Sequence, residues 1–317
     1  AENGEILSMA SSPKFDSNLI IKKPNQNYWE SLLSNPLSPL TDRSVQGLYA
    51  PGSTFKMIVA IAALKHNLIN SKSHFFCESK INYGDRLFHC WKTNGHGKMN
   101  VFSAIKESCD VFFYDLSIKV GIDKIAEVAK DFGLGEIYKA NIGNQKKGIV
   151  PSKKWKKETL KESWYGGETL IAAIGQGYVL SSPLQLAVMT SRIASGGKKI
   201  TPSILKNNKI KNFQLMDKYK KEIKIIQKAM FKVVNETKGT ANKSKAKDFS
   251  FSGKTGTSQV KKITLAERES ENFRKIDIEW KNRDHALFVG YMPSDIPKYA
   301  ISIIIEHGGS GASTAAP

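Results

Sequence analysis

The spacing of apolar and polar residues predicts helices in the middle of the chain and strands towards its end. Apolar residues recur at helical spacing in three middle segments, 101–120, 122–132 and 183–194, as they do along the buried face of a helix. Two late segments, 286–293 and 299–306, are rich in β-branched and aromatic residues, which is typical of strands. The chain therefore combines a helical middle with a late run of strands.

Further segments complete this pattern. A helix is expected to begin near Ser53, and another covers the regularly spaced apolar positions of 223–233. Strands are expected at 4–11 and 249–260. The charged segment 261–283 lies between two predicted strands and is expected to be a long mobile loop.

Together these elements predict an α+β fold, in which an antiparallel sheet of about five strands is covered by helices and joined to an all-helical lobe. Residues 1–12 and 248–306 are assigned to the sheet. Residues 60–247 are assigned to the mostly helical lobe and the lysine-rich helices. The whole chain, 1–317, is interpreted as one domain.

The composition excludes several classes of protein. Hydrophobic residues make up 40% of the 317 residues and charged residues 24%, as in globular domains rather than disordered, collagen-like or coiled-coil chains. No run approaches the ~20 apolar residues that span a membrane. The first residues lack the basic head and apolar stretch of a signal peptide, so any anchor or export signal is expected upstream.

The net charge of +19 comes from two lysine-rich stretches, 139–161 and 198–247. Such stretches can form a surface for nucleic acid or acidic lipid headgroups. Aromatic residues are not interleaved with these lysines, however, as they are where bases stack on a protein. The pattern favours solvated, lysine-coated helices and loops, and no nucleic-acid partner is expected.

One Ser-x-x-Lys tetrad stands out from the seven in the chain. Positions i and i+3 share a helix face, so the lysine amine can remove the proton that keeps the serine hydroxyl a poor nucleophile. Free N–H groups at a helix start also suit a developing oxyanion. Only Ser53-Thr54-Phe55-Lys56 combines a Pro-Gly entry with an apolar helix behind it.

Two further motifs follow this tetrad in a meaningful order. Ser108-Cys109-Asp110 opens an aromatic-rich helical stretch, and Lys254-Thr255-Gly256-Thr257 lies in the first late strand. A strand with small residues can hold an extended peptide by main-chain hydrogen bonds, and its lysine and threonine can hold a carboxylate. The order Ser-x-x-Lys, Ser-x-Asp/Asn, Lys-Thr-Gly is that of the penicillin-recognising serine enzymes.

The chain resembles the penicillin-binding protein 2 family, the class B D,D-transpeptidases of cell elongation, nearly from end to end. Asp110 stands where most of the superfamily has asparagine, but aspartate is usual in this family. The resemblance implies a penicillin-binding-protein/β-lactamase-like fold and a transpeptidase domain whose N-terminal anchor and pedestal are absent from this chain. It also implies the periplasmic face of the bacterial inner membrane as the location. The similar segments are 4–16, 49–56, 95–97, 108–114, 175–178, 183–187, 307–309 and 315–317.

The resemblance assigns roles to the first two motifs. Ser53 is implied as the nucleophile and Lys56 as its general base. A base has to be neutral, and we expect burial and the nearby charge of Lys254 to favour that form of Lys56. Ser108 is implied as a proton relay, and Asp110 as a group that helps to fix the donor peptide.

The resemblance also assigns roles to the strand motif. Lys254 and Thr255 are implied to orient the relay serine and the substrate carboxylate, which Thr257 also contacts. Gly256 is the third residue of that motif. The backbone N–H groups of Ser53 and Thr257 are implied to form the oxyanion hole.

The implied reaction is acyl transfer in peptidoglycan. Ser53 attacks the penultimate D-Ala carbonyl of a stem peptide ending in D-Ala-D-Ala, D-Ala leaves, and an amine on a neighbouring stem resolves the ester. The resemblance further implies inhibition by β-lactams and a role in rod shape. A SEDS glycan polymerase and elongation-complex proteins are implied as partners of the full-length protein. No cofactor is required for this chemistry.

Other functions share the three motifs. A D,D-carboxypeptidase or a class D-like β-lactamase would hydrolyse the acyl-enzyme rapidly, but no deacylating group is evident in the sequence. A non-catalytic β-lactam sensor would acylate without cross-linking, and no signalling domain marks one here. The end-to-end similarity favours the transpeptidase.

Three cysteines and a histidine form a candidate zinc site. Thiolates and imidazole suit tetrahedral Zn²⁺, but the spacing is not that of a zinc finger, so the fold would have to bring the ligands together. The resemblance supports a structural zinc, because some elongation transpeptidases hold zinc just before and within the second motif. Three small buried residues, or a Cys77–Cys90 disulfide with Cys109 free, are the alternatives. The candidate ligands are Cys77, Cys90, His96 and Cys109, with Asp85 and His89 as substitutes.

Overall fold

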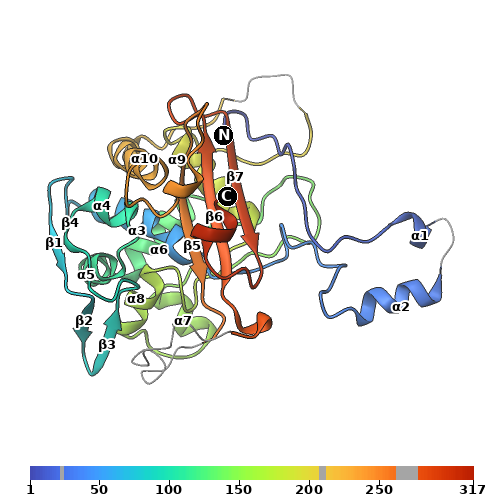
Figure 1. The fold of residues 1–317 in the computed structure, drawn as a ribbon, viewed down its shortest axis with the longest axis horizontal. Helices are drawn as coiled ribbons and strands as arrows, with labels where there is room; N and C mark the ends of the chain where they lie inside the picture. The colour runs from blue at the N-terminus through green and yellow to red at the C-terminus, as the bar shows by residue number, and fades with distance from the viewer. Residues whose placement is uncertain (22–24, 207–211, 262–277) are drawn as a thin grey trace.

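A three-stranded antiparallel sheet forms the centre of the molecule (Figure 1). The computed structural model describes residues 1–21, 25–206, 212–261 and 278–317. The strands are β5 (Ser252–Ser258), β6 (His285–Met292) and β7 (Tyr299–Ile305), in the order β5-β6-β7. Strand β6 is mostly buried, as expected for a central strand of β-branched and aromatic residues.

Helices cover this sheet. Helix α9 (Pro183–Ala194) packs on β6 and β7, and α10 (Lys220–Asn235) packs on β5. A short π-helical turn, η5 (Gly311–Ala315), lies against β6 near the end of the chain. Helix α9 begins with a capping box between Ser182 and Gln185 and has Pro183 at its start, two signals that fix a helix start locally.

The helical lobe is built around α3 (Lys56–Lys65). Residues 56–64 of this helix are all buried, as expected for a helix that is apolar on every side. The helices α4 (Val101–Lys106), α5 (Asp110–Val120) and α6 (Ile122–Asp131) contact α3. Helix α8 (Gly166–Ala173) packs on α5. The lobe therefore places the first motif, at the start of α3, close to the second, which lies between α4 and α5; Figure 1 shows these helices side by side.

Two small antiparallel ribbons lie beside this lobe. Strand β1 (Phe75–Cys77) pairs with β4 (Gly97–Met99), and β2 (Lys80–Tyr83) pairs with β3 (Arg86–His89). The sequence analysis did not predict these strands, although the two-residue Gly84-Asp85 connection between β2 and β3 is a hairpin signal.

The remaining elements are short. Helices α1 (Asn18–Ile21) and α2 (Gln26–Ser34) belong to an arm that extends from the body (Figure 1). Helix α7 (Lys153–Thr159) precedes α8. None of the helices in the described ranges combines the length and the apolar character that a membrane span requires. The 3₁₀ turns are η1 (Gly52–Phe55), η2 (Asp217–Tyr219), η3 (Asn242–Ser244) and η4 (Trp280–Asn282).

The predicted α+β class is confirmed, but the sheet is smaller than expected. Within the described residues it has three strands rather than about five. The segment 1–12 forms only a bridge between Glu5 and Ser203. Its main chain pairs with the segment after α9, since Ile6 N–H donates to Ser203 O at 2.9 Å. Those backbone groups are therefore not available to extend the sheet.

Two further predictions differ from the structure or fall outside it. The single helix expected over 101–120 is divided into α4 and α5, because Ser108 has φ +56°, a left-handed conformation that interrupts a right-handed helix. Most of the predicted loop 261–283 lies outside the described residues.

Candidate active site

The predicted nucleophile lies where the helical lobe meets the sheet. Ser53 is half-buried in η1, one turn before the body of α3. The preceding Gly52 has φ +54°, and a Cβ on it would lie 2.4 Å from Thr257 O. Only glycine permits this approach. The Pro-Gly entry therefore places Ser53 directly against strand β5.

Lys56 points towards the second motif. Its side chain is fully buried, and its Nζ lies 2.7 Å from Asp110 Oδ1. The same amine donates to the backbone oxygen of Ser108 at 2.9 Å and to Ser108 Oγ at 3.2 Å. These contacts join the first motif to the second inside the helical lobe.

Lys254 reaches the same hydroxyl from the sheet. Its Nζ donates to Ser108 Oγ at 3.0 Å, so the hydroxyl lies between two lysine amines. Burial, together with the positive charge of Lys56, lowers the pKa of Lys254 well below that of an ordinary lysine. Lys254 therefore loses its proton more easily than an ordinary lysine.

The turn of the second motif is held by a residue that the sequence analysis missed. Trp91 Nε1 donates to the backbone oxygen of Ser108 at 3.0 Å, and Trp91 N–H donates to Asp110 Oδ2 at 2.9 Å. These bonds support the left-handed conformation of Ser108, which places its hydroxyl between the lysines. A lone tryptophan outside the motifs carried no signal of this role.

The strand motif lies beside the nucleophile. A Cβ on Gly256 would lie 2.9 Å from Pro51 O, so this glycine allows β5 to approach η1 closely. Thr255 Oγ1 lies 2.7 Å from Thr240 Oγ1, so this side chain is directed at the segment after α10. The predicted contacts of Thr255 and Thr257 with a substrate carboxylate stay predictions.

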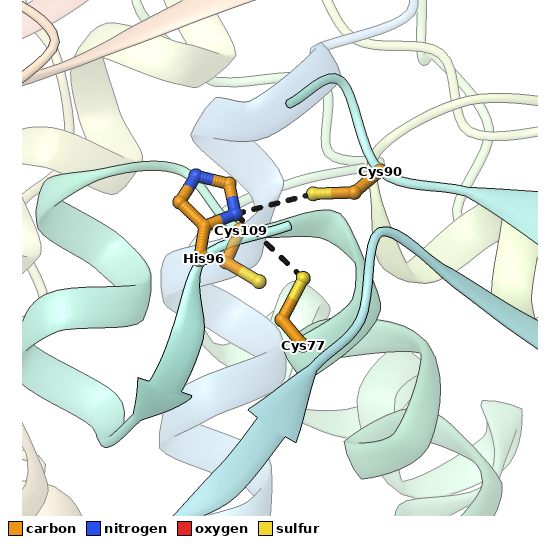
Figure 2. Close-up of side chains that lie close together, drawn as sticks. All are labelled: Cys77, Cys90, His96 and Cys109. Atoms are coloured by element: carbon orange, nitrogen blue, oxygen red, sulfur yellow. Dashed lines mark hydrogen bonds between the residues drawn. The ribbon is translucent and has the colours of Figure 1, made fainter. Parts of the chain in front are cut away.

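The structure brings together the four predicted metal ligands. Figure 2 shows the thiols of Cys77 and Cys90 directed at His96 Nδ1, with the thiol of Cys109 beside them. Their Sγ atoms lie 3.7 and 3.4 Å from that nitrogen. All four ligand atoms lie within 4.8 Å of one another. Neither substitute ligand, Asp85 nor His89, belongs to this cluster.

The three thiols are buried and free, which argues against the Cys77–Cys90 disulfide. They share hydrogen bonds: the bond with Cys109 lowers the pKa of Cys77 to about 6 and also lowers that of Cys90. The same contacts raise the pKa of Cys109. The cluster also touches the second motif, because Asp110 N–H donates to Cys90 Sγ at 3.4 Å.

Comparison with known proteins identifies the family. A profile described as "Penicillin binding protein transpeptidase domain" matches residues 1–317, the whole chain. The chain belongs to the penicillin-binding protein transpeptidase family. The resemblance that the three motifs suggested is thus confirmed.

Several curated relatives are peptidoglycan D,D-transpeptidases named MrdA. The Acinetobacter baumannii protein is 35% identical over 99% of this chain, which covers 48% of that protein. The Escherichia coli K12 protein is 30% identical over 97% of this chain, which covers 50% of that protein. The chain therefore spans about half the length of these transpeptidases.

Solved structures of penicillin-binding proteins share the fold. PBP2 of Helicobacter pylori in complex with MreC has a TM-score of 0.89 and 35% identity, covering 98% of this chain and 56% of that one. PBP2 of Pseudomonas aeruginosa has a TM-score of 0.86 and 33% identity, covering 99% of this chain and 67% of that one.

Proposed function

We propose that this chain is the catalytic domain of a peptidoglycan D,D-transpeptidase of cell elongation, which cross-links stem peptides through an acyl-enzyme on Ser53. The observation that carries the proposal is the meeting of three distant motifs at one hydroxyl. Ser108 Oγ lies 3.2 Å from Lys56 Nζ and 3.0 Å from Lys254 Nζ. A serine next to such a network can be deprotonated when a substrate carbonyl is in place.

Proton movement through Ser108 provides the neutral base that the reaction needs. In this proposal Ser108 Oγ accepts a proton from Lys56, and the Ser108 hydroxyl turns so that it donates its own proton to Lys254 in its neutral form. Lys56 is then neutral and Lys254 is charged. This exchange conserves protons and transfers the positive charge to the strand, where it attracts the terminal carboxylate of a stem peptide.

Acylation of Ser53 and transfer of the acyl group to the acceptor amine then follow. Ser53 Oγ bonds to the penultimate D-Ala carbonyl carbon, and the Ser53 proton passes to Lys56. The C–N bond to the terminal D-Ala breaks, and the leaving amine takes a proton from the network. An amine of a neighbouring stem then bonds to the same carbonyl carbon, the ester C–O bond to Ser53 breaks, and a proton lost by the amine returns through the network to Ser53 Oγ. The N–H groups of Ser53 and Thr257 stabilise the oxyanion in both halves.

A penicillin would react by the same first step. Its strained amide, like the amide of D-Ala-D-Ala, has a carboxylate on the carbon bonded to the amide nitrogen. Its leaving amine stays attached to the adduct, so the acceptor position remains blocked. The domain is therefore proposed as a β-lactam target. A class D-like β-lactamase or a D,D-carboxypeptidase would differ by releasing the acyl group to water.

Intact mass spectrometry after addition of benzylpenicillin tests the function. We expect one adduct per chain, mapped to the Ser53 peptide, that outlasts hours of incubation. A second assay separates a transpeptidase from a sensor. The domain is given a donor thioester or stem peptide together with an amine, and only a transpeptidase should form the product in which the donor acyl group is joined to that amine. Rapid loss of the adduct with hydrolysed penicillin, or no adduct from folded protein, would contradict the proposal.

The full-length protein is proposed to act at the periplasmic face of the inner membrane together with a SEDS glycan polymerase and elongation proteins. Two solved structures similar to this chain support such partners. One holds PBP2 with MreC, and the other is described as a peptidoglycan synthase complex that coordinates polymerisation and crosslinking.

We also propose that the cysteine–histidine cluster holds a structural zinc ion. Tetrahedral zinc with Zn–S bonds of ~2.3 Å separates its sulfur ligands by about 3.8 Å, so ligand atoms within 4.8 Å of one another need only a small contraction. Zinc would supply a fixed tetrahedral anchor. Cys109 is the middle residue of the second motif, so an anchor there would brace Ser108 and Asp110. The proposed ligands are Cys77, Cys90, His96 and Cys109.

Metal analysis of protein purified without chelator tests the zinc proposal. We expect about one zinc per chain, and chelation should lower the thermal unfolding midpoint because metal binding contributes to folding free energy. Cys77→Ser should lose the metal, whereas the control Asp85→Asn, outside the cluster, should keep it. Zinc well below one per chain in folded wild-type protein would contradict the proposal.

A further inference from the structure

The turn Gly175-Gln176-Gly177, which follows helix α8, contacts both sides of the candidate active site. On one side, Gly52 N–H donates to Gly175 O at 2.9 Å, directly before the nucleophile. On the other side, Gln176 Nε2 donates to Thr257 O at 2.9 Å. The sequence analysis assigned Gln176 no role, because a Gly-x-Gly pattern predicts backbone shape and not the target of the central side chain.

The turn 175–177 lies in close backbone contact with both sides of the candidate active site. Gly175 has φ +70°, and a Cβ on it would lie 2.1 Å from Gly52 O. A Cβ on Gly52 would in turn lie 2.4 Å from Thr257 O. Three backbone segments from distant parts of the chain therefore meet without intervening side chains. The long side chain of Gln176, which is 9% exposed, joins two of these segments.

The carbonyl that Gln176 binds belongs to a proposed oxyanion-hole residue. In the antiparallel sheet, a residue's N–H and C=O point to the same side of its strand. Within the described residues, β5 has a partner strand on one side only, and both Gly52 of η1 and the Gln176 amide lie against Thr257 O. The bond from Gln176 to Thr257 O therefore also sets the direction of Thr257 N–H. Gln176 Oε1 accepts from Gln259 N–H at 3.4 Å and supports the same strand end.

We infer that Gln176 is a positioning residue that fixes the oxyanion hole. The inference rests on the proposed function, since it concerns the N–H groups of Ser53 and Thr257. The turn holds the η1 side through Gly175 O and the β5 side through the Gln176 amide. One short rigid segment thus sets the spacing between the two donors before substrate binds. Pre-set donors stabilise an oxyanion far better than donors that must reorganise.

The side-chain chemistry at this position is specific. The amide has to donate to one carbonyl and accept from one N–H, which glutamine does and glutamate does not. In Gln176→Glu, a carboxylate oxygen would face Thr257 O, and a negative charge would lie beside the developing oxyanion. In Gln176→Met, a side chain of similar length would fill the space without either hydrogen bond.

The test uses benzylpenicillin and measures its binding separately from the acylation that follows. Rapid-mixing kinetics give KS for the first complex and k2 for acylation, and the Kd of a phenylboronic acid reports affinity for a tetrahedral adduct on Ser53. For Gln176→Met we expect k2 and boronate affinity to fall together by about ten- to a hundredfold, less than the loss for a direct donor. We expect a larger fall for Gln176→Glu. KS and the thermal unfolding midpoint should change little.

Gln185→Met is the matched control. Gln185 is also buried, and its Nε2 donates to the carbonyls of Glu136 and Lys147 at 2.8 Å. This variant should lower the unfolding midpoint and leave k2 unchanged. Unchanged k2 and boronate affinity in Gln176→Met would overturn the inference, as would losses that follow the unfolding midpoint in both variants. Failure of wild-type protein to acylate would instead overturn the proposed function.

Discussion

Replacing Ser53 with alanine is expected to abolish the penicillin adduct. The variant lacks the only oxygen proposed to bond to the carbonyl carbon, so the acylation rate should fall by at least about 10⁴-fold. Ser53 is half-buried in a turn, and loss of one hydroxyl removes no core packing. The thermal unfolding midpoint should therefore stay close to that of wild-type protein. Intact mass and the rate of fluorescent penicillin labelling measure the effect.

Ser195→Ala provides the control for this experiment. Ser195 begins another Ser-x-x-Lys tetrad, but its hydroxyl donates to the backbone oxygen of Arg192 at 3.3 Å. This variant should label at the wild-type rate. A Ser53→Ala protein that still gains the mass of one penicillin would show that the nucleophile lies elsewhere.

Replacing Lys56 with methionine is expected to cause two separable losses. The buried ammonium lies 2.7 Å from Asp110, whose side chain is 13% exposed. Removing one partner leaves a largely buried carboxylate without its counter-charge, which costs roughly 3–5 kcal/mol of stability. Loss of the general base should also lower the acylation rate about 10²- to 10⁴-fold. Urea unfolding and rapid-mixing acylation measure the two effects.

A double variant separates stability from catalysis. In Lys56→Met/Asp110→Asn the carboxylate charge is removed as well, so most of the lost stability should return. The acylation rate should stay low, because no amine remains at the position of Lys56. Recovery of fast acylation in the double variant would mean that Lys56 acts only by neutralising Asp110, and the base would have to be assigned elsewhere.

Local patterns were sufficient for much of the fold. Helix α9 occupies the predicted 183–194, because its capping box, proline and apolar spacing all act within one or two turns. Strands β6 and β7 lie where β-branched and aromatic residues predicted them. Such signals depend on neighbours in the chain, so they can be read without knowing the tertiary structure.

The break at Ser108 shows where local patterns fail. The apolar spacing of 101–120 continues through the second motif, so a single helix was predicted there. The structure instead places Ser108 at φ +56°, with its backbone oxygen bonded by Trp91. Long-range hydrogen bonds outweigh helix propensity here, because propensity is worth only a few tenths of a kcal/mol per residue.

By itself, the sequence determined the family, the three motifs and the candidate set of cysteine and histidine ligands, because each depends on residue types in a fixed order. Only the tertiary structure decided that one hydroxyl lies between Lys56 and Lys254, 198 positions apart in the numbering, and that Gln176 reaches Thr257. It also placed Cys77 beside His96, through the pairing of β1 with β4. Residue spacing along a chain carries no information about such contacts, which arise from the packing of separate helices and strands around one core.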